Sequence, residues 1–346
     1  MGVETSSPSF IIPRSLTMHL SLAEAETLVV EALQRNRVSA ENARSVAVAL
    51  VAAEAAGQGG HGLRRVPAYA GQAKIGKTDG FAKPQLLRPY PAVLRIDAGN
   101  GYAYPALDLA VAELSIVARE QGIALAAISR SHHAGVMGLT VERFADQGLV
   151  ALMVANAPAS MAPWGGKRPV FGTNPIAFAA PLPDADPIVI DLALSKVARG
   201  KVMAARQKGA PIPADWAYDR DGKPTTDAEE ALAGTMIPAG ESKGAALAMM
   251  VEILSAGLTG ANYSFEASSL FDDQGSPPAL GHTIIAINPA AMSAGDTAKR
   301  LALLASEITS DPNVRLPGRR GQNSRRLALS EGISVEDEVI AAIERL

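Results

Sequence analysis

The chain has 346 residues, of which 48% are hydrophobic and 19% charged, a composition that suits a folded protein with a large core. Its 32 basic and 35 acidic residues leave a net charge of −3 without a basic stripe, which argues against nucleic acid or an anionic membrane as a partner. The absence of cysteine excludes disulfides, thiolate metal sites and cysteine nucleophiles.

The first residues carry no targeting signal that we can identify. Residues 1–14 lack the basic start and continuous apolar core of a signal peptide. No apolar run approaches the ~20 residues of a membrane span. We therefore expect a cytoplasmic protein, with residues 1–20 as an N-terminal arm.

Two helices are predicted after this arm. Ser21-Leu-Ala-Glu24 is a capping box, followed by apolar residues at helical spacing, and Ser39 is predicted to cap a second helix over residues 40–56. The next stretch, Gly57-Gln-Gly-Gly-His-Gly62, matches G-x-G-x-x-G. It follows a helix rather than a strand, and no βαβ unit surrounds it, so we reject it as a dinucleotide fingerprint.

His61 and Arg65 stand four residues apart at the start of another predicted helix, where they would share one face. A guanidinium can pair with a carboxylate in a planar fork, while an imidazole donates a proton to the neighbouring atom. This combination suits a small carboxylate substrate. The alternative is a capped helix start with a solvated arginine.

Apolar runs separated by polar loops predict an α/β body. The predicted strands are residues 91–97, 123–129, 149–154, 187–191 and 282–288. The predicted helices are residues 104–120, a short helix ending near Gly148, and residues 195–206, 245–258, 296–310 and 334–346. The polar connection at residues 208–226 is predicted to be a surface hairpin.

Residues 131–175 are predicted to form the centre of the site. The strands at 123–129 and 149–154 deliver glycines, small residues, imidazoles and amides into adjacent loops. A flat ligand with a polyphosphate needs such a surface, because it approaches backbone N–H groups closely. The alternative is that these glycines and prolines make tight turns.

Three further segments bear polar groups that could belong to a site. Asp191 ends an apolar strand, where a carboxylate is costly unless it is paired, and the simpler interpretation is a salt bridge or a cap for the next helix. Lys243 and the N–H groups of the following helix could hold a phosphate, or Ser242 is an N-cap. The arginines of residues 314–321 could meet a cofactor phosphate or face water. Five histidines without acidic neighbours at ligand spacing make a metal site unexpected.

Taken together, these motifs resemble one family, the type-2 malate/lactate dehydrogenase family of NAD(P)-dependent oxidoreductases. The motifs are His61-Gly-x-x-Arg65, Ser131-His-His-Ala-Gly135, Trp164-Gly-Gly166, Gly172-Thr-Asn-Pro175, Ile190-Asp-Leu-Ala193, Ser242-Lys-Gly244 and Arg315-Leu-Pro-Gly318. The resemblance runs in order from Ser21 to Leu346. The family also contains ureidoglycolate, sulfolactate and diketogulonate enzymes, and Δ1-piperideine-2-carboxylate/Δ1-pyrroline-2-carboxylate reductases.

The resemblance implies an α/β fold that is not a Rossmann fold: a mixed-sheet NAD(P)-binding domain flanked by helices, with a helical substrate-side region, as in sulfolactate dehydrogenase. It also implies a homodimer. The expected divisions are the arm at 1–20, a helical region carrying His61 and Arg65 at 21–85, the mixed-sheet cofactor domain at 86–310, and a basic cofactor loop with C-terminal helices at 311–346. Those last helices are expected to pack on the N-terminal helical region.

By the same resemblance, His61 is the proton donor, Asp191 is its charge partner and holds it cationic, and Arg65 anchors the substrate carboxylate. Further substrate contacts are expected at Thr140, Ala193 and Leu194. NADPH is the preferred cofactor and NADH the alternative, because the arginine-rich loop could meet a 2′-phosphate. The expected cofactor contacts are Ser131, His132, His133, Ala134, Gly135, Gly172, Thr173, Asn174, Lys243, Gly244, Arg315, Gly318, Arg319 and Arg320.

Two positions depart from the family pattern. Gly60 stands where many relatives have the serine of a Ser–His–Asp relay, and Ser242 stands where relatives often have histidine. A cyclic imine can arrive already protonated, so a relay without its serine can suffice for such a substrate.

The leading interpretation is the reduction of a cyclic 2-imino acid, Δ1-pyrroline-2-carboxylate or Δ1-piperideine-2-carboxylate, to L-proline or L-pipecolate. The stretches around His61 and Ala70-Gly-Gln-Ala-Lys74 resemble that branch most. The alternatives are a malate/L-lactate-type 2-hydroxy acid dehydrogenase acting on a small 2-oxo acid, and a catalytically silent relative that binds nucleotide. Malate would require a second cation for its distal carboxylate.

Overall fold

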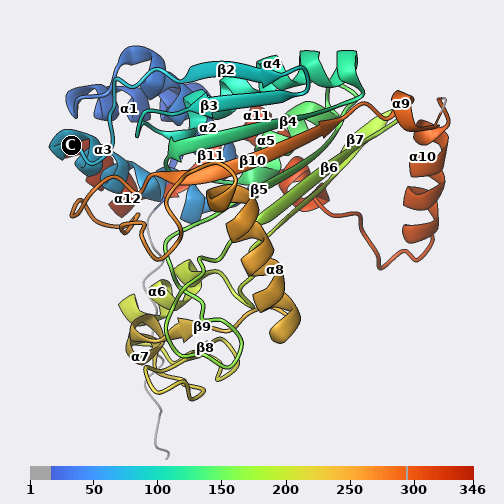
Figure 1. Ribbon diagram of the computed structural model, residues 1–346. Helices are drawn as coiled ribbons and strands as arrows, with labels where there is room; N and C mark the ends of the chain where they lie inside the picture. Colours follow the sequence, from blue (N-terminus) through green and yellow to red (C-terminus); the bar gives the residue numbers. More distant parts are fainter. Residues whose placement is uncertain (1–16, 294) are drawn as a thin grey trace, which may run out of the picture.

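A seven-stranded mixed sheet forms the centre of the protein, with strands in the order β2-β3-β4-β10-β5-β6-β7 (Figure 1). The computed structural model describes residues 17–293 and 295–346. The strands are β2 (Gln85–Tyr90), β3 (Val93–Asp97), β4 (Ile123–Ser131), β5 (Val150–Ala155), β6 (Ile176–Leu182), β7 (Ala185–Leu192) and β10 (Leu280–Ile287).

Only β3 and β4 run parallel in this sheet, and every other neighbouring pair is antiparallel. A Rossmann sheet is mostly parallel, so the expected non-Rossmann fold with a mixed sheet is confirmed. The strands β2 and β6 are missing from the sequence-based prediction. All of β2 is exposed, so it lacks the alternation of buried and exposed residues that marks a strand.

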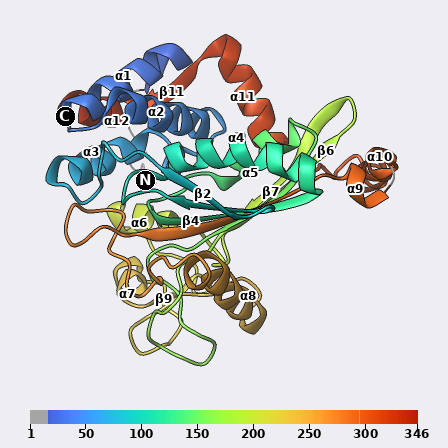
Figure 2. The ribbon, with the colours of Figure 1, turned by 45° about the horizontal axis from the view of Figure 1, so that its top comes forward.

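Helices cover the two faces of the sheet unequally (Figure 2). The helices α4 (Ala103–Gln121) and α5 (Met137–Ala145) pack on one face. On the other face lies α8 (Ser242–Glu252), continued by a π-helical turn, Ile253–Gly257. None of the helices in the described ranges is long and apolar enough to cross a membrane.

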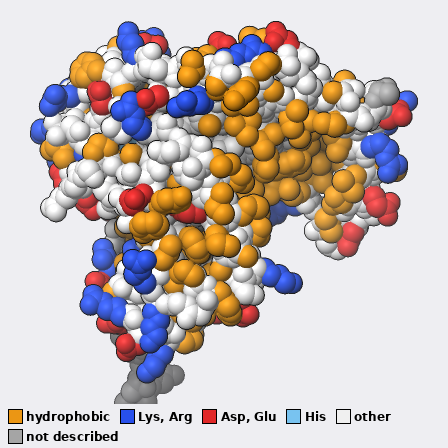
Figure 3. All heavy atoms as spheres, viewed as in Figure 1, with side chains coloured by type: hydrophobic (Ala, Val, Ile, Leu, Met, Phe, Trp, Pro, Cys, Tyr) orange, Lys and Arg blue, Asp and Glu red, His pale blue; other side chains and the backbone are white. Residues whose placement is uncertain are grey.

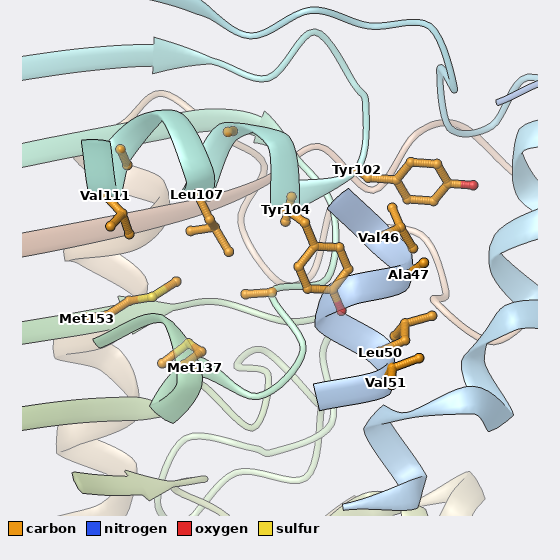
Figure 4. Close-up of a cluster of buried hydrophobic side chains, with 14 of the residues drawn as sticks. Val46, Ala47, Leu50, Val51, Tyr102, Tyr104, Leu107, Val111, Met137 and Met153 are labelled. Carbon is orange, nitrogen blue, oxygen red and sulfur yellow. The ribbon is translucent and has the colours of Figure 1, made fainter. Parts of the chain in front are cut away.

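The N-terminal helices α1 (Leu22–Arg35), α2 (Ala40–Ala55) and α3 (Val66–Ile75) pack beside α4, and the largest core joins them to the sheet. Figure 4 shows Val46, Leu50 and Val51 of α2 in the same cluster of buried side chains as Tyr104 and Leu107 of α4. The predicted caps are present, because Ser21 and Glu24 form the capping box and Ser39 accepts from Asn42 N–H. The expected helix 40–56 is therefore α2.

The C-terminal segment returns to these N-terminal helices. The helix α11 (Arg319–Glu331) packs on α2, and α12 (Asp337–Glu344) packs on α1 and α3. Between them β11 (Ile333–Glu336) pairs antiparallel with β1 (Thr17–Leu20). The prediction of one helix over 334–346 is wrong, since alternating burial at Ile333 and Val335 makes the start a strand. The last four residues of the expected arm form β1, and residues 1–16 lie outside the described residues.

A smaller unit with its own apolar core lies below the sheet in Figure 1. It contains α6 (Arg199–Gln207), β8 (Ala217–Tyr218), α7 (Ala228–Ala233) and β9 (Thr235–Met236). The helix predicted from Ser195 thus begins at Arg199. The predicted hairpin at 208–226 is present as a short turn with an antiparallel bridge between Tyr218 and Pro224, and its strand β8 also pairs with β9 outside that segment.

The helices α9 (Ala290–Ser293) and α10 (Thr297–Ile308) project beyond the sheet (Figures 1 and 2). Between α8 and α10 the surface is a continuous apolar area (Figure 3). The strands present one row across this face, in register and half-buried: Leu125, Ile285, Leu152, Phe178 and Ile190. On α10, Leu303 and Leu304 are exposed.

Candidate active site

The segments that carry the expected site residues leave the sheet at one end. The last residue of β4, Ser131, lies opposite Leu280, the first residue of β10. Near the end of β5, Val154 lies opposite Ile176, which begins β6 and faces Leu192 at the end of β7. The loops that follow β4, β5 and β7 therefore meet on one side of the sheet.

Glycines allow the chain to turn sharply into the site after α2. Glu54 of α2 accepts a hydrogen bond from the N–H of Leu63 at 2.9 Å. A Cβ on Gly62 would lie 2.2 Å from the Glu54 carboxylate, so only glycine permits this approach. The G-x-G-x-x-G match is thus the turn that ends α2, in agreement with its rejection as a fingerprint.

His61 lies in the first of two short 3₁₀ turns, Gly59–His61 and Leu63–Arg65, and α3 begins only at Val66. The prediction of a regular helix from His61 is therefore wrong. The His61 ring stacks on the ring of His133 with centroids 5.1 Å apart and planes at 19°. Its Nδ1 is buried and has no hydrogen-bond partner among the described residues.

Arg65 lies beside this stack, half-buried. Its Nε donates to the carbonyl oxygen of Gly60 at 2.8 Å, and its guanidinium carbon lies 4.6 Å from the ring centre of Phe271. The carbonyl and the ring together orient the plane of the guanidinium. Its two terminal nitrogens form no hydrogen bond with another described residue. They remain available to a carboxylate in the fork geometry expected from the sequence.

His133 is held from behind by tyrosines. Its Nδ1 lies 2.8 Å from the hydroxyl of Tyr69, which lies 3.4 Å from the hydroxyl of Tyr104. Both tyrosines are buried. Gly135 adopts φ +65°, and a Cβ there would lie 2.5 Å from the Tyr104 hydroxyl, so this position also requires glycine.

Ser131 and His132, expected to contact the cofactor, instead face the core. The Ser131 hydroxyl lies 3.0 Å from Nε2 of His282, and Nε2 of His132 lies 2.7 Å from Oε1 of Gln72. Both side chains are 1% exposed and therefore cannot reach a ligand. Within the motif, His133 and the backbone of Ala134 and Gly135 remain for that role.

Asp191 forms a hydrogen bond with the backbone of α5. Its Oδ2 accepts a hydrogen bond from the N–H of Gly138, in the first turn of α5, at 2.7 Å. Surrounding protein raises the carboxyl pKa, and this hydrogen bond opposes the shift. The capping interpretation is thus correct in kind, although the capped helix is α5 rather than the helix that follows Asp191.

The expectation that Asp191 holds His61 cationic stays a prediction. Burial, and to a smaller extent the positive charge of Arg65, lower the pKa of His61 to about 4. No hydrogen bond joins His61 to Asp191. His61 is therefore neutral at pH 7 in this structure.

A second group of expected residues gathers at the N-terminus of α8. Leu194 N–H donates to the Thr173 carbonyl at 2.8 Å, and Ala239 N–H donates to the Leu194 carbonyl at 2.8 Å. A Cβ on Gly244 would lie 2.1 Å from the Ala239 carbonyl oxygen, so the loop and the helix touch. Lys243 is exposed beside them.

Ser242 is not the N-cap of this helix. It is the first helical residue, and Glu241 occupies the cap position with φ 57°. Ala193 is half-buried next to Leu194 and belongs to the same group.

Gly172 and Asn174 serve the packing of this region. Asn174 donates to Glu252 at 2.7 Å and to the Ala248 carbonyl at 2.9 Å, and its side chain is fully buried. A Cβ on Gly172 would lie 2.1 Å from the Ala157 carbonyl oxygen. Asn174 therefore anchors the loop to α8, and Gly172 allows the loop to pass close to the backbone of Ala157.

The basic segment is a loop only as far as Gly318, because Arg319 begins α11. Arg319 forms an ion pair with Asp186 at 3.1 Å. Arg315 and Arg320 are exposed and form no ion pair with another described residue. This segment and α8 lie on opposite sides of the sheet in Figure 2, so the structure does not bring the two groups of expected cofactor contacts together.

Thr140, an expected substrate contact, lines a cavity of about 620 Å³ between α2, α4, α5 and α11. Tyr104 lines the same cavity, whereas His61 and Arg65 do not. Tyr104 thus stands between this cavity and the His133–Tyr69 pair. The structure does not place Thr140 in the His61 cluster.

Three residues of the cluster were missed by the sequence analysis: Tyr69, Tyr104 and Phe271. Tyr69 lies four residues after Arg65, so helical spacing could have indicated it. Tyr104 and Phe271 come from distant segments and carry no local signal. Within the described residues, no group of three or more His, Asp or Glu could hold a metal ion.

Comparison with known proteins places this chain among oxidoreductases. The model of the malate/L-lactate dehydrogenase family matches residues 20–344. A (2R)-3-sulfolactate dehydrogenase (NADP(+)) from Chromohalobacter salexigens is 50% identical over 307 residues, which are 89% of this chain and 92% of that protein.

Two further similarities involve imino acid reductases. A Δ1-pyrroline-2-carboxylate/Δ1-piperideine-2-carboxylate reductase from Pseudomonas putida is 39% identical over 337 residues, 96% of this chain and 98% of that protein. The crystal structure of Δ1-piperideine-2-carboxylate reductase from Pseudomonas syringae superposes with a TM-score of 0.90 at 37% identity, covering 95% of this chain and 99% of that one.

Proposed function

The chain belongs to the malate/L-lactate dehydrogenase family of NAD(P)-dependent oxidoreductases, and on that premise we propose that it uses NADPH to reduce a cyclic 2-imino acid. The substrates are Δ1-pyrroline-2-carboxylate and Δ1-piperideine-2-carboxylate, and the products are L-proline and L-pipecolate. The observation that carries this choice is the electrostatics of the cluster. It combines one cation, Arg65, with a His61 that is neutral at pH 7.

Arg65 is suited to bind the single carboxylate of such a substrate. Its two free terminal nitrogens can form the bidentate pair, which fixes the ring of the substrate relative to His61. After burial, the charge of Arg65 is the next largest cause that lowers the pKa of both His61 and His133. The single carboxylate of the substrate balances the positive charge of Arg65.

A neutral His61 is compatible with a substrate that brings its own proton. A protonated cyclic imine carries positive charge on nitrogen, and addition of a hydride at C2 yields the neutral amine without a proton from the protein. His61 can then orient that N–H by accepting it, instead of donating a proton. The reduction of a 2-oxo acid differs, because its alkoxide must be protonated.

The second group of residues is suited to hold the cofactor, which supplies the hydride when bound. Lys243 is exposed at the N-terminus of α8, next to the backbone of Thr173 and Leu194, so charge and free N–H groups favour a phosphate there. The choice of NADPH over NADH is supported by the 50% identical relative, which is a (2R)-3-sulfolactate dehydrogenase (NADP(+)).

A second candidate function is the interconversion of a 2-hydroxy acid, such as 3-sulfolactate, and its 2-oxo acid. It is supported by the 50% identity to a sulfolactate dehydrogenase. A neutral His61 could accept the hydroxyl proton during oxidation. The sulfonate would require a cation besides Arg65, and that cation must come from outside the cluster.

We also propose that the chain acts as a homodimer, with the apolar area between α8 and α10 as the interface. Five large apolar side chains lie in register across the sheet there, and Leu303 and Leu304 of α10 are exposed beside them. Apolar areas of this kind mark interfaces, and sheets commonly pack face to face.

The experiment is a panel of initial rates with NADPH and NADH. We expect turnover of the two cyclic imines with NADPH at a higher kcat/KM than of pyruvate, oxaloacetate or 3-sulfopyruvate. A preference for 3-sulfopyruvate would replace the first candidate with the second. Tight NADPH binding without turnover of any compound would instead support a catalytically silent nucleotide-binding protein.

A further inference from the structure

His61 lacks the contacts that usually fix the ring of a histidine in an active site. The ring is half-buried, and its buried Nδ1 has no hydrogen-bond partner among the described residues. Gly60, the preceding residue, supplies no hydroxyl, and Asp191 is engaged with Gly138. Whatever fixes the plane of this ring must therefore act through packing.

His133 provides that packing. The two rings are nearly parallel, at 19°, with centroids 5.1 Å apart, so His133 covers one face of His61. His133 is itself fixed, because its Nδ1 lies 2.8 Å from the Tyr69 hydroxyl and its ring meets that of Tyr69 edge-on at 78°. Tyr69 is fully buried and cannot move aside without disturbing the core.

We propose that His133 is a positioning residue, which holds the ring of His61 in place by stacking and is held in turn by the hydroxyl of Tyr69. This inference rests on the proposed function and assigns a new role within it. It differs from the expectation that His133 contacts the cofactor with its side chain. The difference can be measured, because the first role affects turnover and the second affects cofactor affinity.

Stacking also determines how much water reaches His61. The titratable or charged groups around the pair are Arg65 from the second 3₁₀ turn, Tyr69 from α3, Tyr104 from α4, His132 after β4 and His282 of β10. Burial is the main cause that lowers the pKa of His61 to about 4. Removing the His133 ring would admit water to one face of His61, and its pKa would rise toward the ordinary value of ~6.5.

The first test compares His133→Ala, which removes the stack, with His133→Phe, which keeps an aromatic ring. In His133→Ala we expect kcat to fall by about tenfold to a hundredfold, as misplaced catalytic groups do, and the Kd for NADPH to stay within about twofold. His133→Phe should recover several-fold of the lost kcat. A Kd that rises about tenfold with an unchanged kcat would overturn the proposal and return His133 to the cofactor site.

Tyr69→Phe tests whether the hydrogen bond from the Tyr69 hydroxyl holds His133 in place. It removes only the hydroxyl, and we expect a smaller loss of kcat, about threefold to tenfold, with an unchanged Kd for NADPH. His19→Phe, on β1, is the matched control and should leave both quantities unchanged. An equal loss of kcat in this control, or none in Tyr69→Phe, would contradict the role assigned to Tyr69.

The second test needs no turnover, so it separates this inference from the proposed function. Imidazole signals of the five histidines can be followed by NMR as a function of pH, with His61 assigned from its loss in His61→Ala. We expect the pKa of His61 to rise in His133→Ala and to stay low in His133→Phe. A pKa that is the same in the wild type and both variants would refute the stacking role. If all substrates fail but this rise is seen, only the proposed function is lost.

Discussion

Arg65 differs from its neighbour Arg64 in what surrounds its guanidinium. Arg64 is exposed and already paired with Glu336 and Glu338, whereas Arg65 keeps its terminal nitrogens free beside His61. Both residues are basic and adjacent, so the sequence alone does not tell them apart. Only the direction of each side chain separates an exposed ion pair from a site for a carboxylate.

We therefore expect Arg65→Lys to raise the KM for the imino acid by about tenfold to a hundredfold, since a point charge replaces the bidentate fork. Steady-state kinetics measures this, and the change in kcat should be smaller. Arg64→Lys is the matched control and should leave KM unchanged. Equal effects of the two substitutions would remove Arg65 from its role as anchor.

Two glycines near His61 are predicted to respond in opposite ways to a side chain. A Cβ on Gly60 meets nothing within 4 Å, so Gly60→Ser should change the free energy of unfolding by no more than about 0.5 kcal/mol. Gly135→Ala should cost about 1–2 kcal/mol for its positive φ, and more for the contact with Tyr104. Urea unfolding of both variants checks this. A destabilised Gly60→Ser would show that this position is not open.

At the scale of the element, α5 depends on a residue far away in the sequence. Its N-cap residue, Val136, offers no side-chain acceptor, and Asp191 of β7 supplies one to Gly138 instead. The helix follows directly after the loop that carries His133. Asp191 therefore links the geometry of the loop to the edge of the sheet.

We expect Asp191→Ala to lower the free energy of unfolding by about 1 kcal/mol, as the loss of a cap does, and Asp191→Asn to preserve most of it. Thermal or urea unfolding gives these values. The kcat of the two variants separates the cap from the charge. If Asp191→Asn keeps the activity that Asp191→Ala loses, catalysis depends on the helix cap. Equal losses of activity in both variants would show that the negative charge is required.

At the scale of the whole molecule, buried histidines make the fold sensitive to acid. Burial lowers the pKa of His132 to about 3 and that of His282 to about 4, and the pKa of His133 is also well below 6.5. In the unfolded chain these groups titrate near ~6.5. Below that pH the unfolded state binds protons that the folded state does not, so acid favours unfolding.

Stability should therefore be constant above about pH 7 and fall as the pH drops from about 6.5 toward 4, by on the order of 2 kcal/mol per buried histidine at pH 5. Urea unfolding at several pH values measures this. His282→Gln should reduce the dependence on pH. A stability that stays flat from pH 7 to pH 5 would contradict these lowered pKa values.

The proposed dimer makes a further prediction for the whole molecule. Phe178 lies at the middle of β6 in the apolar row and is half-buried in one chain. Phe178→Asp should convert a dimer into a monomer, because it places a charge within an apolar interface. Light scattering after gel filtration measures the mass, and Leu329→Asp, exposed on α11, serves as control. If the wild-type protein has the mass of a monomer, the proposed dimer is wrong.

Much of the local structure could be predicted because its causes are local. The capping box at Ser21, the N-cap at Ser39 and the apolar runs of the inner strands lie within a few residues of what they stabilise. The mixed α/β fold with a non-Rossmann sheet was also correct, although it came from the motifs rather than from periodicity. The exposed β2 was missed because it lacks alternating burial, and the strand at Ile333–Glu336 was missed because its partner, β1, is distant in the sequence.

The site shows the same division. Residue types and their spacing indicated that His61 and Arg65 belong to one site, because the two residues lie only four positions apart in the sequence. Only the tertiary structure decided that His133 covers His61, that Asp191 caps α5, and that Ser131 and His132 face the core. Stacking, burial and the pKa of an imidazole depend on atoms brought in from distant strands and helices, and no local pattern encodes which atoms those are.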